Sequence, residues 1–247
     1  MRTLLVSDIH ANLPALQAVL RAVRRKRISR LISLGDVVGY GASPNQVLAL
    51  LRRQRRTKVF LRGNHDRVAT GNSDPDDFNN AAKKAILWSR EKLSREALGT
   101  LRDFTTGPFE LEDGTLLCHG SPDDEDEYLL NEMQAVRIFS THPNRLIFFG
   151  HTHLPSVFAI HPSGKVTGEL VDGGTTLNLD PAVRYLINPG SVGQPRDRDS
   201  RAAFAIWDSA RGTVRFLRTA YDVSESIHAI CEAGLPEILG RRLKTGF

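Results

Sequence analysis

Short apolar segments alternate with amphipathic ones over the first 66 residues of the chain. Residues 3–7, 31–34 and 59–61 are short apolar runs, typical of buried strands. Between them, over 13–23 and 44–54, apolar residues recur at helical spacing. This alternation predicts right-handed crossovers and a largely parallel sheet. Because ligands collect at the carboxyl ends of parallel strands, the residues that follow each strand are the first candidates for a functional site.

Polar residues of metal-binding type follow almost every predicted strand. The apolar runs at 115–118 and 146–149 are two further strands, and five of the eight histidines lie in the turns after strands. Taken singly, each polar residue is equally well explained as a turn residue, a helix cap or a hydrogen-bonded histidine. Together they predict a single site built from Asp8, His10, Asp36, Asn64, His65, His119, His151 and His153.

The rest of the chain predicts a helical insertion followed by a strand-rich half. Residues 67–104 form the insertion, which we expect to lean over the site. Its helices cover 79–92 and 95–104, and the later expected elements are a strand at 109–111, a helix at 128–139, strands at 185–187, 202–207 and 214–218, and helices at 222–233 and 236–243. The strands after residue 157 predict a second, mostly antiparallel sheet. We expect one domain spanning 1–247.

Residue spacing suggests how two metal ions would share these side chains. Asp8 and His10 are separated by one residue, so in extended backbone both leave on the same side, as do His151 and His153. Asp36 can offer one oxygen to each of two ions about 3.5 to 4 Å apart. The simplest partition gives one ion Asp8, His10, Asp36 and His153, and the other Asp36, Asn64, His119 and His151. Spacing alone does not select this partition over its permutations.

The donor types also restrict the metal. Imidazole nitrogens mixed with carboxylate and amide oxygens, without thiolate, suit transition metals better than magnesium or calcium. We therefore expect two divalent transition-metal ions, manganese first, with iron, nickel or zinc as alternatives.

These motifs, in this order and spacing, resemble those of the calcineurin-like metallophosphoesterase superfamily. The matching segments are Asp8-Ile9-His10, Gly35-Asp36, Gly63-Asn64-His65-Asp66, His119 and Gly150-His151-Thr152-His153. Two further segments, 39–41 and 188–196, resemble secondary signatures of its small bacterial and archaeal phosphodiesterases. The resemblance implies an α/β fold, a four-layer αββα sandwich of two central mixed β-sheets flanked by helices. It also implies a dimetal centre with the ligand partition given above.

The expected activity is dimetal-dependent hydrolysis of phosphodiester bonds. Two cations would neutralise the anionic oxygens of the ester and acidify a bridging water, and the resulting hydroxide would attack phosphorus in line. His65 is left over after the ligands are assigned and is the candidate general acid, with Asp66 orienting its imidazole and favouring its charged form. The resemblance implies the same two roles. Expected substrate-binding residues are Asn64, His65, Arg67 and Tyr40, and further residues able to surround a phosphate are Arg62, Arg196 and Arg198.

Composition restricts the partners. The net charge is +5, and basic runs at 21–30 and 52–58 carry much of the positive charge. Both runs fall at polar ends of predicted helices and lack interleaved aromatics for base stacking, so we expect no nucleic-acid partner. The acidic run at 123–127 is predicted to be a solvated loop. The expected partner is a small phosphoester substrate, with nucleotides as candidates.

Further features predict a cytoplasmic protein. No stretch approaches the roughly 18 apolar residues of a membrane span, and the N-terminus enters a strand without a signal peptide. The two cysteines, Cys118 and Cys231, give no disulfide framework and suit a reducing compartment.

Three alternative functions stay open at this point. A basic surrounding would suit a dinucleoside polyphosphate such as diadenosine tetraphosphate, which some relatives of this branch hydrolyse. A non-catalytic scaffold is a second alternative, because the retromer scaffold subunit resembles this fold but has lost parts of the metal site. A nuclease is the third. Every ligand position and His65 are filled in this chain, which favours the phosphoesterase.

Overall fold

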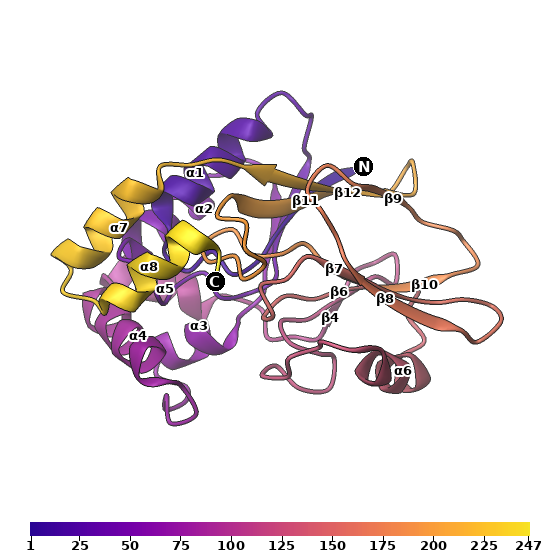
Figure 1. Ribbon diagram of the computed structural model, residues 1–247, viewed down its shortest axis with the longest axis horizontal. Coiled ribbons are helices and arrows are strands. Elements are labelled where there is room, and N and C mark those ends of the chain that lie inside the picture. The colour runs from indigo at the N-terminus through magenta and orange to yellow at the C-terminus, as the bar shows by residue number, and fades with distance from the viewer.

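A computed structural model describes all 247 residues as two six-stranded mixed sheets with helices outside them (Figure 1). The first sheet has the order β3-β2-β1-β11-β12-β9, and the second has the order β4-β5-β6-β10-β7-β8. The strands are β1 Arg2–Val6, β2 Arg30–Ser33, β3 Thr57–Phe60, β4 Phe109–Glu110, β5 Leu116–Leu117, β6 Leu146–Phe148, β7 Ser156–Ile160, β8 Val166–Leu170, β9 Thr176–Asn178, β10 Arg184–Asn188, β11 Ala202–Asp208 and β12 Thr213–Thr219. The predicted α/β sandwich is confirmed.

Eight helices cover the outer faces of the sheets. They are α1 Leu13–Ala22, α2 Pro44–Arg52, α3 Asn64–Ala69, α4 Asn80–Lys92, α5 Arg95–Arg102, α6 Glu132–Thr141, α7 Val223–Glu232 and α8 Glu237–Thr245. Apolar side chains of α1, α2, α4 and α5 pack on the outer face of the first sheet, and those of α6 on the second. A third apolar cluster fills the space between the sheets. None of the helices has the length and apolar character needed to cross a membrane.

The parallel strands of both sheets bring their carboxyl ends together. In the first sheet β1, β2 and β3 run parallel, and in the second sheet β5, β6 and β10 do so. The turns after β1 and β6 approach so closely that a Cβ on Gly150 would lie 2.0 Å from Ser7 Oγ. Only glycine therefore allows the ends of the two sheets to meet at this point.

The predicted division of strands between the sheets is wrong. The strands after residue 157 do not form a sheet of their own, because β9, β11 and β12 join the first sheet and β7, β8 and β10 join the second. β11 pairs antiparallel with β1, whose residues Leu4, Leu5 and Val6 are fully buried. A strand that is apolar on both faces belongs inside a sheet, so β1 takes a neighbour on each side.

Two helices differ from the prediction. Residues 64–69, for which no helix was expected, form α3, whose first turn is stabilised by Asp66 accepting a hydrogen bond from the Gly63 amide at 3.1 Å. Helix α6 begins at Glu132 rather than near residue 128, because the Asn131 side chain caps it by accepting from the Gln134 amide.

Candidate metal centre

All seven predicted ligands lie together where the strands end. Asp8 and His10 follow β1, Asp36 follows β2, Asn64 begins α3, His119 follows β5, and His151 and His153 follow β6. Each is at most 8% exposed. Donor atoms of Asp8, His10 and His153 lie within 4.8 Å of one another, and so do those of Asp36, His119 and His151. The structure therefore brings the predicted residues into two adjoining groups, while ligation itself stays a prediction.

Within the first group, two imidazole nitrogens and two carboxylates face one another. His10 Nε2 lies 3.1 Å from His153 Nε2, and His153 Nε2 lies 3.5 Å from Asp8 Oδ1. His10 Nε2 is 3.7 Å from Asp36 Oδ2. These spacings suit donors that surround one ion.

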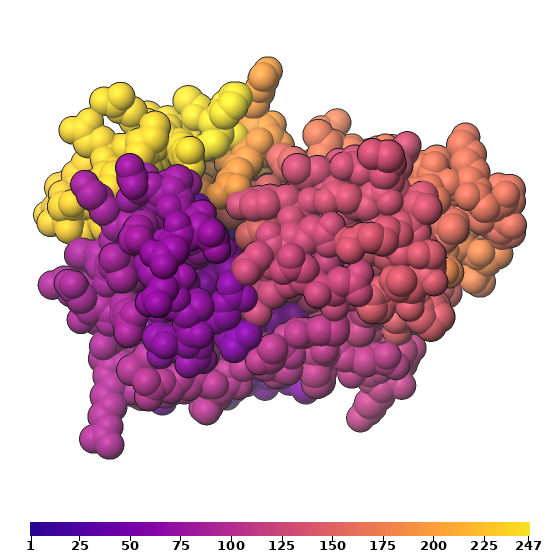
Figure 2. All heavy atoms as spheres, turned by 90° about the horizontal axis from the view of Figure 1, so that it is seen from below, coloured from indigo at the N-terminus to yellow at the C-terminus, as the bar shows by residue number.

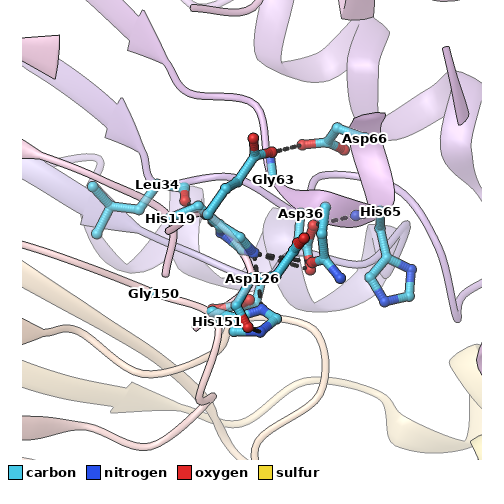
Figure 3. Close-up of polar contacts among 12 residues, drawn as sticks. Leu34, Asp36, Gly63, His65, Asp66, His119, Asp126, Gly150 and His151 are labelled. Carbon is cyan, nitrogen blue, oxygen red and sulfur yellow. Dashed lines mark hydrogen bonds and ion pairs between the residues drawn. The ribbon is translucent and has the colours of Figure 1, made fainter. Parts of the chain in front are cut away.

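The second group has the same character (Figure 3). His119 Nε2 lies 3.4 Å from Asp36 Oδ2, 3.2 Å from Asn64 Oδ1 and 3.2 Å from His151 Nδ1. Asp36 Oδ2 is thus near both groups, while Asp36 Oδ1 accepts a hydrogen bond from the His65 amide at 2.9 Å. A single oxygen of Asp36 therefore lies between the two groups, whereas the prediction was one oxygen toward each ion.

Backbone carbonyls select which nitrogen of each histidine faces the site. The Nδ1 atoms of His10, His119 and His153 lie 3.1, 2.8 and 2.6 Å from the carbonyl oxygens of Val38, Leu34 and Gln194. A carbonyl can only accept, so each Nδ1 carries a proton, and Nε2 is the nitrogen that faces the site and can coordinate. His151 is reversed, because its Nε2 lies 3.1 Å from the Asp126 carbonyl oxygen and its Nδ1 faces the site. Such contacts orient ligating histidines.

The protonation states of most site residues also fit cations. His119 is the exception: burial opposes its charged form, but Asp36 and Asp8 raise its pKa to about 10, so a bound cation would have to displace a proton from this ring. Burial lowers the pKa of His10 and His153 well below the usual value and that of His151 to about 3, so these rings are neutral at pH 7 and can coordinate. Burial works against ionisation of Asp36, but His119 and His65 hold its pKa well below the usual value. Burial raises the pKa of Asp8 to about 7, and neither of its buried carboxylate oxygens has a hydrogen-bond partner. A buried carboxylate without partners is costly alone and favourable beside a cation.

The backbone at the site is strained. Six site residues other than glycine adopt left-handed conformations with φ from 48° to 64°: Asp8, His10, Asp36, Tyr40, His151 and His153. Residues other than glycine seldom adopt this conformation, although asparagine, aspartate and histidine do so more often than the rest. Such conformations concentrate at functional sites. These left-handed turns, rather than the extended backbone predicted for Asp8, His10, His151 and His153, direct the side chains from the strand ends into the site.

His65 lies beside both groups without a partner for its ring. Its Nδ1 is buried and has no hydrogen-bond partner, and its ring packs between those of Tyr40 and Phe78, each 4.6 Å away between centroids. A Cβ on Gly39, at φ +89°, would lie 2.3 Å from His65 Nδ1. Gly39 therefore leaves the space that the imidazole fills, a steric role that sequence spacing did not reveal.

The predicted role of Asp66 is wrong. Its carboxylate points away from the His65 ring (Figure 3) and accepts hydrogen bonds from the amides of Val37, Val38 and Gly63 at 3.0 to 3.1 Å. Successive residues of a helix point about 100° apart, so Asp66 cannot orient its neighbour. Burial lowers the pKa of His65 to about 4, opposite to the predicted effect. Asp66 fixes the loop after β2 against α3 instead.

The acidic run is a loop with Asp123, Asp124 and Asp126 exposed, as predicted, and its Glu125 and Asp126 also pair with arginines beside the site. Glu125 Oε2 pairs with Arg62 Nη2 at 2.9 Å and Arg67 Nη1 at 3.3 Å, and Asp126 Oδ2 pairs with Arg67 Nη2 at 2.7 Å. Figure 2 shows the pink segment around residues 115–140 lying against the purple helical segment. The charge of Arg67 is already compensated by these carboxylates, which removes the support for its predicted role in substrate binding.

Sequence and structure comparisons place the chain in a family. Residues 1–212 match the calcineurin-like phosphoesterase superfamily domain. The chain belongs to this superfamily. The uncharacterized protein MJ0912 of Methanocaldococcus jannaschii is 36% identical to this calcineurin-like phosphoesterase over 248 residues, which covers 98% of this chain and 96% of that protein. The predicted resemblance is confirmed.

Two solved structures share the fold over the full chain. A metallophosphoesterase from Sphaerobacter thermophilus has 37% identity and a TM-score of 0.85, covering 100% of this chain and 99% of its own. The hypothetical protein PH1004 from Pyrococcus horikoshii has 21% identity and a TM-score of 0.81, covering 100% and 98%. Membership of the calcineurin-like phosphoesterases implies a hydrolase that uses metal to cleave phosphoesters, and the Asp and His clusters described above are able to bind metal.

Proposed function

We propose that this chain hydrolyses phosphodiesters with two divalent transition-metal ions, manganese first. The position of Asp36 carries the proposal, because its Oδ2 lies 3.7 Å from His10 Nε2 and 3.4 Å from His119 Nε2. A carboxylate shared by two groups of nitrogen and oxygen donors is the arrangement of a dimetal site. Asp8, His10, Asp36 and His153 would hold one ion, and Asp36, Asn64, His119 and His151 the other.

The chain's own residues supply rigidity to this centre. Bound ions would neutralise phosphoryl oxygens and supply a water nucleophile at neutral pH. Each ligating imidazole is fixed by a hydrogen bond from its other nitrogen to a backbone carbonyl. Little reorganisation is then needed when charge develops on the phosphoryl group.

His65 is the proposed proton donor to the leaving oxygen. Its ring is adjacent to both ligand groups, and its Nδ1 is not used by any protein partner. In the free protein burial lowers its pKa to about 4, whereas the negative charge of a bound phosphate would raise the pKa again. Asn64 and Tyr40 flank the same space and are the proposed substrate contacts.

A substrate panel with manganese tests the proposal. Monoesters, diesters, cyclic nucleotides and dinucleoside polyphosphates are compared at equal concentration, with metal content measured in the same samples. We expect hydrolysis of bis-p-nitrophenyl phosphate that a chelator abolishes and manganese restores. A protein with two bound ions and no phosphoesterase activity would refute the proposal. An empty or single-metal site without activity on bis-p-nitrophenyl phosphate would favour the scaffold.

The panel also separates the remaining alternatives. Preferential cleavage of diadenosine tetraphosphate over simple diesters would assign the chain as a dinucleoside polyphosphate hydrolase. Cleavage of single- or double-stranded nucleic acid at comparable rates would assign it as a nuclease.

Gly39→Ala tests the placement of His65. The added Cβ would collide with His65 Nδ1, so we expect kcat to fall about a hundredfold, as a displacement of about 1 Å of a reacting group does. Both metal ions are expected to remain. Steady-state kinetics and metal analysis measure the two effects.

Gly164→Ala is the matched control. Gly164 has φ +82°, close to that of Gly39, but no atom lies within 4 Å of the place that an added Cβ would occupy, so the substitution adds backbone strain without a clash. Equal activity losses in the two variants would show that His65 is not the cause.

A further inference from the structure

Arg196 carries a positive charge that no carboxylate pairs with. It lies in the loop between β10 and β11, and its Nη2 donates to Tyr40 Oη at 3.4 Å and to Gln194 Oε1 at 3.5 Å. Both contacts are at the long limit for hydrogen bonds and use neutral acceptors, although a guanidinium has five N–H donors. Arg62 and Arg67, by contrast, pair with Glu125.

The residues that contact Arg196 also contact the metal centre. The Tyr40 ring packs against the rings of His10 and His65, with centroids 4.5 and 4.6 Å apart. The Gln194 carbonyl oxygen lies 2.6 Å from His153 Nδ1. The guanidinium is therefore one residue away from the first ligand group and from the proposed proton donor.

This placement is electrostatically unfavourable unless an anion is present. The adjoining groups are suited to cations, so a nearby guanidinium would add positive charge to positive charge. A partly buried arginine normally pairs with a carboxylate because desolvation of an unpaired charge is costly. The planar fork of a guanidinium matches two oxygens of a phosphate.

The loop that carries Arg196 is held on both sides. The Gln194 carbonyl oxygen accepts from His153 Nδ1, and the Arg198 amide donates to the Gly246 carbonyl at 2.8 Å. Tyr40, the other contact of Arg196, packs in an apolar cluster with Ile230, Leu239 and Leu243 of α7 and α8. These C-terminal helices lie beyond residues 1–212, so a part of the chain outside the matched family domain supports this side of the site.

We infer that Arg196 binds the phosphoryl oxygens of the substrate and is held in position for this by Tyr40, Gln194 and the C-terminal helices. The identity of the substrate in this inference rests on the proposed function. The binding of phosphate by Arg196 does not depend on it.

Titration calorimetry with inorganic phosphate tests the inference on the full chain, with and without metal. Arg196→Met is expected to weaken phosphate binding about 10- to 100-fold, the effect of losing hydrogen bonds to a charged group. In the manganese-loaded enzyme the same variant should raise KM for bis-p-nitrophenyl phosphate and the inhibition constant of phosphate together. Arg196→Lys should bind with intermediate affinity, because it keeps the charge and loses the fork.

Arg201→Met is the matched control from the same loop. The Arg201 guanidinium is exposed and pairs with Asp199, with Nη2 2.6 Å from Asp199 Oδ2. We expect this variant to bind phosphate as the parent chain does. If Arg196→Met is unstable, Arg196→Lys carries the test, and unchanged phosphate affinity in either Arg196 variant with intact metal content would overturn the inference. A parent chain that binds phosphate through Arg196 and hydrolyses no ester would instead refute the proposed function alone.

Discussion

Asp36→Asn is expected to lose both metal ions and about a thousandfold in phosphoesterase activity. Asp36 Oδ2 lies between the two ligand groups, and an amide at this position offers a neutral oxygen in place of a charged one. Charge stabilisation by metal contributes several kcal/mol to catalysis, and about 1.36 kcal/mol corresponds to tenfold in rate. Asparagine tolerates the left-handed backbone at φ 55°, so the fold should persist.

Asp8→Asn is the variant to compare with Asp36→Asn for loss of metal. Asp8 belongs to the first group alone, so we expect its replacement to remove one ion and to leave the other. Elemental analysis of the dialysed variants measures the ratio of metal to protein, and kcat/KM is measured on the same samples. Asp123→Asn, on the surface, should keep two ions and full activity. Two retained ions in Asp36→Asn would rule out a bridging role.

His65→Ala is expected to lower kcat by about 10²- to 10⁴-fold for esters with poor leaving groups, the usual contribution of a general acid. Esters of p-nitrophenol should suffer less, because their leaving oxygen needs little protonation. The metal content should stay at that of the parent chain. Rates across a series of leaving groups with increasing pKa measure the predicted dependence.

Metal analysis decides between this role and ligation. A His65 ring nitrogen lies within 4.8 Å of donor atoms of His10 and Asp36, so the geometry also permits a ligand at this position. Loss of an ion in His65→Ala would reassign the residue as that ligand. His142→Ala is a suitable control, because His142 pairs with Asp123 away from the site, and it should change neither rate nor metal content.

The site could be anticipated because its residues obey a local rule. Asp8, Asp36 and His119 each follow a strand, and the carboxyl ends of parallel strands share one edge of a sheet. No contact between distant residues had to be known. The alternation of strands and helices up to residue 66 contained enough information to place the first three strands.

The errors arose where distant contacts decide the structure. β11 pairs with β1 although the two strands are far apart in the sequence. The residue pattern of neither strand identifies the strand it pairs with. Because Asp66 follows His65 in the sequence, it was expected to orient the imidazole. In the helix the two side chains point in different directions, and Asp66 accepts from backbone amides instead. The pairing of Glu125 with Arg62 likewise depends on the folding together of segments 63 residues apart.

The left-handed residues of the metal centre have a consequence for how such chains change over evolution. Each costs about 1–3 kcal/mol of strain that glycine would largely remove. A descendant that no longer needed the cations would gain thermal robustness by exchanging Asp8, His10 or His151 for glycine. Aspartate and histidine kept at these turns therefore identify, in newly sequenced genomes, lineages in which selection still maintains the pocket.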